Sequence, residues 1–318
     1  MQHNILITSA GKRVALTKYF KETLSRFYPD AKVFTTDMNP QMAPAGHVSD
    51  GCFKVPRVTS EDYMEILLSI CTENEIGLVV PTIDTELLIL SANKELFAKR
   101  GIVFCISDYD FVSLCRDKRK TNAMFEQLNI RIPKPIDKNN PTFPLFAKPY
   151  DGSLSTDLHV VRNKEELTQE ILDNPKLIFM EYIDKREYKE FTVDMYFGKD
   201  NEVKSIVPRE RIEIRAGEIN KGIARKNYLL RCLKENISFL KGVIGCICIQ
   251  LFYREEDNDV VAIEVNPRFG GGYPLSYAAG ANYPELLIRE YFLGETLSYN
   301  EDWTDGKLML RYDDAVFV

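Results

Sequence analysis

The sequence is poor in the residues and patterns that mark several common classes of protein. It has only three histidines, so a histidine-based zinc site is not expected. Its seven cysteines include no Cys-x-x-Cys pair, and we expect them to be buried thiols in a reducing compartment. No apolar run approaches the roughly 20 residues that span a bilayer, and the first residues lack the plan of a signal peptide. These absences predict a cytoplasmic protein with no membrane partner.

Two further patterns are missing. The 41 basic and 47 acidic residues give a net charge of −6 and form no block of one sign, which argues against a nucleic-acid partner. Gly11-Lys12 resembles the end of a P-loop, but Leu6 stands where that motif needs glycine and Arg13 where it needs Ser or Thr. The G-x-G-x-x-G pattern is also absent. The segment 9–13 is therefore either a helix N-terminus able to hold a substrate carboxylate or phosphate, or a plain surface turn.

The order of predicted elements indicates two architectures in succession. A chain of 318 residues suggests two or three domains. Strands expected at 4–8, 32–36, 78–80 and 102–106 alternate with helices, which predicts an α/β domain with a parallel sheet. After a Pro- and Asn-rich stretch at 132–144 the rhythm changes to α+β. We expect an N-terminal α/β domain at 1–113, a small subdomain at 114–183 and a large subdomain at 184–318.

In the second half, strands are expected at 143–149, 177–183, 191–197 and 203–208. We expect Asn163 and Glu166 to cap a helix between the first two of these strands. Further helices are expected at 117–128, 224–241 and 283–292.

The segment Ala262–Gly272 is the most informative part of the chain. Glu264, Asn266 and Arg268 lie two residues apart, so on a strand they share one face. If the hairpin folds symmetrically about Asp257, Gln250 lies opposite Glu264. Oxygen ligands of this kind suit Mg²⁺, and the arginine suits a transferring phosphoryl group. The alternative is a polar strand end with a Pro-Arg turn, but the register of the glutamine favours metal–phosphate chemistry.

Two lysines precede features that could contact phosphate. Lys148 ends a predicted strand and is followed by the small loop Gly152-Ser153-Leu154-Ser155, whose backbone N–H groups could approach phosphate oxygens. Lys118 opens a predicted helix. Taken separately, the loop could be an ordinary exposed hairpin and Lys118 a surface lysine.

Two glutamates stand at the ends of apolar strands. Backbone groups just past Glu181 could pair with the edge of an adenine, and Glu190 could accept hydrogen bonds from ribose hydroxyls. Each glutamate could instead be a solvated strand end.

The order of these segments resembles the ATP-grasp superfamily and, more narrowly, one synthetase module of the large subunit of carbamoyl phosphate synthetase. The resemblance runs from about residue 4 to about residue 293. It implies an N-terminal α/β domain followed by two α+β subdomains that grip ATP. It also implies a set of nucleotide ligands: Lys118, Lys148, Gly152, Ser153, Ser155, Glu181, Tyr182, Ile183 and Glu190.

Within this set, the resemblance gives the lysines and the small loop to the phosphates, residues 181–183 to adenine and Glu190 to ribose. It implies that Mg²⁺, or Mn²⁺ in its place, is bound by three residues: Gln250, Glu264 and Asn266. Catalysis is assigned to Lys148 and Arg268, which stabilise the transferring phosphoryl group. One departure concerns the acceptor, because Phe-Gly-Gly-Gly-Tyr follows Arg268 where the synthetase has a serine-rich segment.

The resemblance places the acceptor between the N-terminal domain and the large subdomain. We expect polar groups to run there from the phosphate end of ATP through Arg268 and Arg215 to the strand ends at 9–13 and 84–86. Arg211 or Arg215 would then bind the carboxylate of the acid, although this charged segment could also be a solvated loop. Asp84 or Glu86 would attract a cationic amine, or would only charge the first turn of their helix.

The leading hypothesis is an ATP-dependent carboxylate–amine or carboxylate–thiol ligase that acts through an acyl phosphate. The alternatives are a stand-alone synthetase-like module that phosphorylates bicarbonate or carbamate, and a non-catalytic ATP-binding regulatory subunit. We expect small-molecule carboxylate and amine substrates as partners, and we allow for a homodimer.

Overall fold

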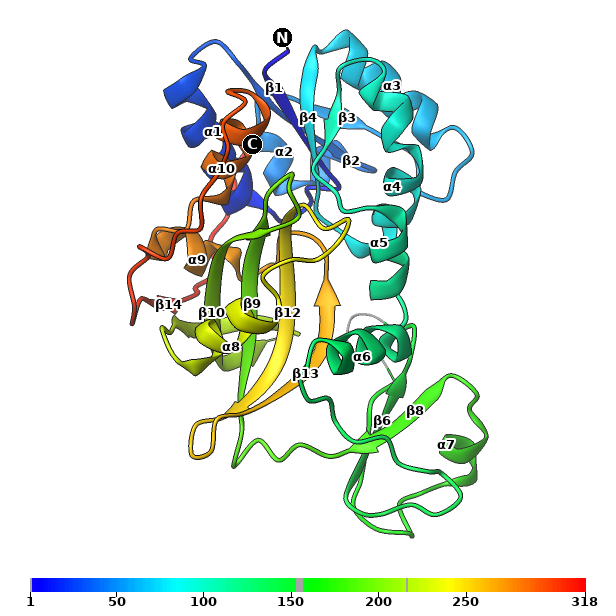
Figure 1. The fold of residues 1–318 in the computed structure, drawn as a ribbon. Helices are drawn as coiled ribbons and strands as arrows, with labels where there is room; N and C mark the ends of the chain where they lie inside the picture. The colour runs from blue at the N-terminus through cyan, green and yellow to red at the C-terminus, as the bar shows by residue number, and fades with distance from the viewer. Residues whose placement is uncertain (1, 153–156, 216) are drawn as a thin grey trace.

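The N-terminal domain is a parallel sheet covered by helices (Figure 1). The computed structural model describes residues 2–152, 157–215 and 217–318. The five strands lie in the order β3-β2-β1-β4-β5. The elements of this domain are β1 (Asn4–Thr8), α1 (Val14–Phe27), β2 (Val33–Asp37), η1 (Pro40–Met42), α2 (Pro44–Val48), β3 (Cys52–Lys54), α3 (Tyr63–Glu73), β4 (Ile76–Pro81), α4 (Asp84–Ala98), β5 (Val103–Phe104) and α5 (Tyr109–Cys115).

The central strand shows why the sheet is covered on both faces. Ile5, Leu6 and Ile7 of β1 are all fully buried, with successive side chains on opposite faces. Parallel strands bring their carboxyl ends to one edge, so the loops after β1 and β4 lie beside each other. This edge faces the second half of the chain.

A small antiparallel sheet follows, in the order β7-β6-β8. Its strands and nearby helices are α6 (Lys118–Gln127), β6 (Leu145–Pro149), β7 (His159–Val161), α7 (Gln169–Asp173) and β8 (Leu177–Glu181). Figure 1 shows this unit at the lower right, connected to the N-terminal domain through α5 and α6.

The largest sheet has six antiparallel strands in the order β13-β12-β9-β10-β11-β14. Its strands and helices are β9 (Lys189–Phe197), β10 (Val203–Arg215), β11 (Glu218–Ala224), α8 (Tyr228–Asn236), β12 (Gly245–Arg254), β13 (Asp259–Asn266), α9 (Tyr273–Ala279), α10 (Tyr283–Tyr291) and β14 (Leu308–Leu310). Residues such as Val193, Ile249 and Val265 fill an apolar core on one face. The opposite face carries polar side chains such as Asp194 and Gln250, beside apolar ones such as Tyr196 that pack toward the N-terminal domain.

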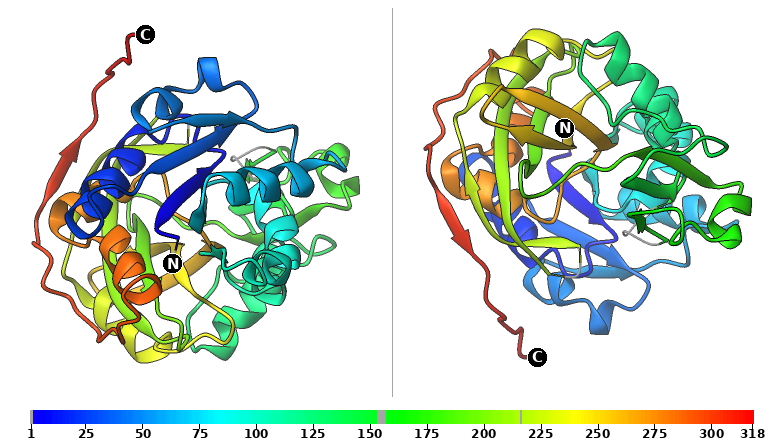
Figure 2. Two further views of the ribbon diagram at one scale, coloured as in Figure 1. Left: turned by 90° about the horizontal axis from the view of Figure 1, so that it is seen from above. Right: turned by 90° about the horizontal axis from the view of Figure 1, so that it is seen from below.

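The N-terminal domain and the large sheet share a hydrophobic core. Helices α9 and α10 lie beside α1 (Figure 1), and Phe20 of α1 packs edge to face against Phe269. The C-terminal segment runs along the outside of the molecule (Figure 2). None of the described helices is long and apolar enough to cross a bilayer.

The expected fold class, a parallel-sheet α/β domain followed by α+β subdomains, is confirmed. Two helix predictions are wrong. Asn163 Oδ1 accepts from Glu166 N, and the Glu166 side chain accepts from Arg162 N, but these bonds close only a turn. Helix α7 begins at Gln169, after the capping residue Thr168. The segment expected as one helix at 224–241 is helical only over Tyr228–Asn236, because Ala224 still pairs with β10.

Candidate active site

The predicted metal ligands lie on the polar face of the six-stranded sheet. Gln250 of β12 is directly opposite Glu264 of β13, as the sequence predicts. Near the turn, Arg254 lies opposite Asp259, so the pairing there is centred between Glu256 and Asp257 rather than on Asp257. A register shift between Leu251 and Gln250 leaves Ile263 without a partner on β12, and this shift places Gln250 opposite Glu264. The predicted pairing is therefore confirmed, but it depends on a bulge that symmetry about Asp257 does not include.

The ligand candidates contact one another through a few hydrogen bonds. Asn266 Nδ2 donates to Glu264 Oε1 at 3.0 Å, which leaves the amide oxygen and Glu264 Oε2 available. Arg211 Nη1 donates to Gln250 Oε1 at 3.4 Å. No cation of the described residues lies within ion-pair distance of Glu264. The three oxygen-bearing side chains thus share one surface with a single carboxylate that no described residue neutralises.

Both predicted phosphate-binding lysines lie close enough to Glu264 for its charge to affect their pKa values. Lys148 on β6 is only 5% exposed. Burial lowers the pKa of Lys148 to about 8; the nearby Glu264 opposes this shift and Lys118 adds to it. Burial also lowers the pKa of Lys118, and Glu264 again opposes the shift. Three elements distant in sequence, α6, β6 and β13, therefore bring their charged groups together.

Helix α6 is fixed to the loop that follows β6. The Asp117 side chain accepts a hydrogen bond from the backbone N–H of Arg119 and so caps the helix. Lys118 N donates to Tyr150 O at 2.8 Å, and Lys118 Nζ donates to Gly152 O at 2.6 Å. The predicted loop residues Ser153 and Ser155 lie outside the described residues.

Glu181, at the end of β8, is held in an ion pair. Its carboxylate oxygens accept from Arg131 Nη2 at 2.6 and 2.7 Å, and Arg131 Nη1 reaches Asp259 at 3.1 Å. The backbone groups of Tyr182 and Ile183 make no hydrogen bond to another described residue. The side chain of Glu181 is therefore occupied, whereas the backbone just beyond it is available.

Glu190 lies at the start of β9 and is mostly buried. It pairs with Arg211 and accepts from Lys185 Nζ at 2.9 Å. Arg211 also donates to Gly217 O at 2.8 Å. The predicted ribose ligand is thus linked through one guanidinium to the predicted metal ligand Gln250.

The three arginines in the second half of β10 lie in three different environments. Arg209 is buried and makes two hydrogen bonds to Asp194, at 2.7 and 2.8 Å. Arg211 points into the site, as described above. Arg215 is 70% exposed and reaches only the exposed Asp313, at 3.3 Å. The segment is a strand rather than a loop through Arg215, although residues 212–215 are exposed to solvent.

Arg268 connects the sheet to the N-terminal domain. Its Nη2 atom donates to Asp84 Oδ2 at 2.6 Å, at the first residue of α4. Burial alone would lower the pKa of Arg268, but the ion pair with Asp84 outweighs burial and raises the pKa. The Nε atom of Arg268 is buried without a hydrogen-bond partner among the described residues.

Glu86 occupies a different environment from Asp84. It is fully buried and accepts from Ser9 Oγ at 2.7 Å and from Thr82 N at 2.9 Å. A further bond from Ile83 N to its side chain closes the first turn of α4. This geometry fits the helix-capping interpretation of Glu86.

A basic side chain of segment 9–13, which the sequence analysis left open between an anion-holding helix N-terminus and a plain turn, lies at the same junction. Arg13 follows β1 and donates to the Thr82 carbonyl at 3.4 Å. Burial, and then the nearby Arg268, lower the pKa of Arg13. The signals in the sequence were its position after the first strand and the basic side chains beside a predicted helix N-terminus.

The glycines after Arg268 permit close packing. A Cβ on Gly272 would overlap the guanidinium of Arg209. This contact explains a glycine at that position without involving substrate.

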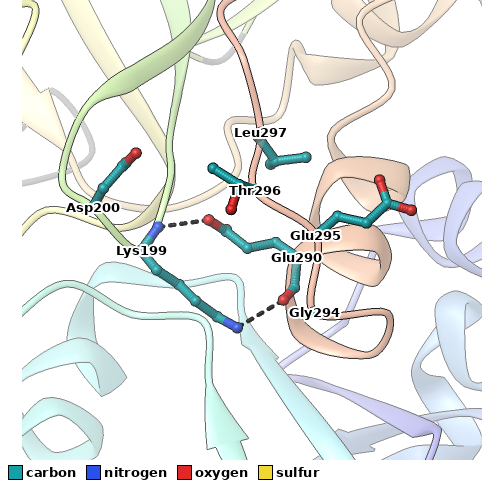
Figure 3. Close-up of a pocket in the computed structure, with 7 residues that line it drawn as sticks. All are labelled: Lys199, Asp200, Glu290, Gly294, Glu295, Thr296 and Leu297. Atoms are coloured by element: carbon teal, nitrogen blue, oxygen red, sulfur yellow. Dashed lines mark hydrogen bonds between the residues drawn. The ribbon is translucent and has the colours of Figure 1, made fainter.

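A separate hollow of about 190 Å³ is formed at the other end of the sheet (Figure 3). Lys199 donates there through its backbone and side-chain nitrogens to Glu290, at 2.7 Å in each case. Lys199 lies seven residues beyond Thr192, the partner of Gln250, which corresponds to roughly 20 Å along a strand. The hollow is therefore not part of the site described above.

Two family models match separate parts of the chain. Residues 5–105 match the PylC-like N-terminal domain. Residues 173–312 match the family described as "ATP-grasp in the biosynthetic pathway with Ter operon". No curated protein sequence matches the chain.

Solved structures resemble the whole chain at low identity. The biotin carboxylase domain dimer of Hydrogenobacter thermophilus 2-oxoglutarate carboxylase, solved with MgADP, ADP and bicarbonate, is 14% identical, with a TM-score of 0.73 over 95% of this chain and 72% of that one. N5-carboxyaminoimidazole synthetase from Staphylococcus aureus, in complex with ADP, is 15% identical, with a TM-score of 0.70 over 93% and 78%. L-amino acid ligase from Bacillus licheniformis is 18% identical, with a TM-score of 0.67 over 91% and 73%.

At these identities the structural likeness shows the fold alone. Combined with the two family models, it confirms the resemblance to the ATP-grasp superfamily, while the narrower resemblance to a carbamoyl phosphate synthetase module stays a prediction. The chain thus has the ATP-grasp fold, with an ATP-grasp family match over residues 173–312 and a PylC-like N-terminal domain match over residues 5–105.

Proposed function

We propose that this protein is an ATP-dependent ligase that joins a carboxylate to an amine or a thiol through an acyl phosphate. One observation carries the proposal. Lys118, Lys148 and Glu264, from three separate elements, converge beside the paired Gln250. Buried cations next to a carboxylate and amide oxygens form a suitable surface for a metal-bound polyphosphate.

The donor set fits Mg²⁺, with Mn²⁺ as a substitute. Glu264, Asn266 and Gln250 offer only oxygen ligands, and they are few enough to leave positions for phosphate oxygens and water. Among the described residues, no group of three or more His, Cys, Asp or Glu side chains could hold a metal. A softer or more acidic metal cage is therefore not supported in this part of the chain. A bound ion would neutralise charge on the phosphates.

The nucleotide fits between the small sheet and the large one. In this proposal Lys118 and Lys148 hold the phosphates, and the backbone N–H groups of Gly152, Ser153 and Ser155 donate to them. The backbone of Tyr182 and Ile183 pairs with adenine, supported by its lack of hydrogen bonds to described residues. Glu190 accepts from the ribose hydroxyls; its link through Arg211 to Gln250 supports this orientation. The ADP bound in the S. aureus synthetase is consistent with ATP as the substrate here.

The chemistry proceeds in two displacements. An oxygen of the substrate carboxylate attacks the γ-phosphorus, the bond to the β,γ-bridging oxygen breaks, and ADP leaves. The amine nitrogen or thiol sulfur then attacks the acyl carbon, phosphate leaves, and the proton of the nucleophile passes to solvent. Lys148 and Arg268 stabilise the transferring phosphoryl group, so the chain contributes position and charge rather than a covalent nucleophile.

The acceptor is proposed to lie between Arg268 and the N-terminal domain. Asp84 remains a candidate for attracting the amine, because its ion pair with Arg268 places it at this junction. Arg211 is engaged by Glu190 and Gln250, and Arg215 is exposed. A homodimer is a further proposal, supported by the dimeric biotin carboxylase domain with a similar fold.

The test is ADP release from Mg-ATP by purified protein with a panel of carboxylic acids, each with and without amines and thiols. Hydroxylamine should trap the acyl phosphate as a hydroxamate. Acid-dependent ADP release with hydroxamate formation is the expected result. ADP release with bicarbonate as the only acid favours a synthetase-like module, and ATP binding without any turnover favours a regulatory subunit. Absence of ATP binding contradicts the proposal.

A further inference from the structure

The loop after β1 is shaped to place one arginine at the junction of the domains. Ser9 has φ = 50° and Gly11 has φ = 46°, so two residues in the left-handed region turn the chain sharply. Ser9 Oγ is held by Glu86 at 2.7 Å, and Arg13 N donates to Ala10 O at 2.7 Å. The strain at Ser9 is therefore maintained by specific contacts, as is common beside functional sites.

Two guanidinium groups from opposite domains are anchored on the same short turn. Arg13 Nη2 donates to the carbonyl of Thr82, and Arg268 Nη2 donates to the carboxylate of Asp84 two residues later. Thr82 is itself fixed, because its hydroxyl donates to Thr8 O and Ser9 O at 2.9 Å each. The turn therefore holds both arginines at one place.

The charges at this place do not balance. Asp84 is the only carboxylate that pairs with Arg268, and no carboxylate of the described residues lies within ion-pair distance of Arg13. Glu218, whose charge reaches Arg13 from a greater distance, is paired with Arg311 at 3.0 Å. Arg268 Nε is also buried without a partner among the described residues. A guanidinium does not lose its proton in a protein, so the half-buried Arg13, which has no carboxylate partner among the described residues, is suited to binding an anion.

We propose that Arg13, together with Arg268, binds the carboxylate of the acid substrate. The two planar guanidinium groups are anchored on one turn, so a carboxylate can accept hydrogen bonds from both. Arg268 lies two residues after Asn266, so the bound acid is next to the metal and phosphate end of the site. This inference rests on the ligase function proposed above, and it assigns to Arg13 the carboxylate-binding role that the sequence analysis expected of Arg211 or Arg215.

The test compares Arg13→Ala with Lys12→Ala. Lys12 is the adjacent basic residue and is exposed, so its removal makes the same change in net charge outside the site. The affinity for Mg-AMP-PNP is measured by calorimetry, and KM is measured for an acid that supports ADP release. Arg13→Ala should raise KM for the acid about 10- to 100-fold, the loss expected for charge-assisted hydrogen bonds, with nucleotide affinity within about twofold of wild type. Arg13→Lys should be intermediate, because it keeps the charge but loses the fork.

Thermal shifts with acetate, succinate and L-glutamate provide a readout that does not require turnover. A stabilisation of the wild type and of Lys12→Ala that Arg13→Ala lacks is the expected result. An unchanged KM and thermal shift in Arg13→Ala would overturn the inference, as would absence of any shift in the wild type. An equal loss of Mg-AMP-PNP affinity would overturn it as well, because Arg13 would then serve the nucleotide. If Mg-AMP-PNP does not bind the wild type, the ligase function fails, whereas the shifts still decide the role of Arg13.

Discussion

Two buried lysines in this protein have opposite surroundings. Lys148 on β6 and Lys204 on β10 are each 5% exposed. Lys204 Nζ pairs with Asp200 at 2.5 Å and Glu202 at 3.2 Å. Burial alone would lower the pKa of Lys204, but these two carboxylates raise it. Lys148 makes no ion pair or hydrogen bond with another described side chain, and its pKa is lowered to about 8.

The difference distinguishes charges that the fold itself neutralises from charges that are left for a ligand to neutralise. Lys204 is neutralised by two carboxylates in the segment just before its strand, near the protein surface. The charge of Lys148 is neutralised by no described residue, and a buried charge without a partner is costly. Such an arrangement is expected where a ligand supplies the missing charge.

The two arginine environments show the same contrast. Arg209 and Asp194 are both buried, and Ser276 Oγ adds a further hydrogen bond to the carboxylate at 2.5 Å. Arg13 has only one long hydrogen bond, to a carbonyl. We therefore assign Arg209 to the fold and Arg13 to substrate.

The largest expected effect is on stability, from Arg209→Met. This change leaves the Asp194 carboxylate buried without its cation and should reduce the free energy of unfolding by about 3–5 kcal/mol. Urea denaturation measures the loss. Arg215→Met is the matched control on the same strand, because Arg215 is exposed, and it should change stability by less than about 0.5 kcal/mol. Equal effects of the two changes would show that burial and pairing do not distinguish these arginines.

The next largest effect is on turnover, from Glu264→Gln. The substitution removes the only carboxylate among the proposed metal ligands and should reduce kcat about 10²- to 10³-fold, as is found when one transition-state-stabilising group is lost. ADP release measures kcat, and thermal denaturation should show an intact fold. Glu256→Gln, in the exposed turn of the same hairpin, should have normal activity. Normal turnover of Glu264→Gln would remove the metal assignment.

The pH dependence of stability sharpens the comparison of the lysines. The folded-state pKa of Lys148, about 8, lies below the ordinary value of 10.5. The unfolded chain therefore binds more protons between these values, and wild-type stability should rise with pH there. Without metal or nucleotide, the difference in unfolding free energy between wild type and Lys148→Met should move by about 2 kcal/mol in favour of the wild type from pH 7 to pH 9.5.

Lys204→Met is the control for this measurement. A raised folded-state pKa contributes stability that is lost only as the pH rises through that pKa. The difference between wild type and Lys204→Met should therefore stay nearly constant over the same interval. A pH dependence in the opposite sense for Lys148 would show that the burial of its charge has been misjudged.

The sequence predicted the parts of the site that depend on local pattern. Alternation along β12 and β13 placed Gln250, Glu264 and Asn266 on one face. The bulge at Ile263 has no marker in the sequence, because an extra residue in a strand is decided by pairing and twist. The pairing of Gln250 and Glu264 was predicted because they lie on neighbouring strands of one hairpin.

The sequence could not separate residues whose roles depend on distant partners. Asp84 and Glu86 both stand in the first turn of α4, yet Asp84 contacts Arg268 and Glu86 is buried against Ser9. Arg13 and Lys12 are adjacent basic residues, and only the packing of two domains places Arg13 beside Arg268. Strand β11 was missed because its pairing with β10, rather than its composition, defines it.

The central claim, that charges left unneutralised by the fold belong to the ligand, is tested most directly by calorimetry and thermal denaturation of Lys148→Met and Lys204→Met with Mg-AMP-PNP. We predict that Lys148→Met loses nucleotide affinity by at least about tenfold while its unfolding temperature stays equal or rises, because a buried unpaired charge is removed. Lys204→Met should bind the nucleotide normally and unfold at a lower temperature. Unchanged nucleotide affinity together with a lower unfolding temperature for Lys148→Met would contradict the account.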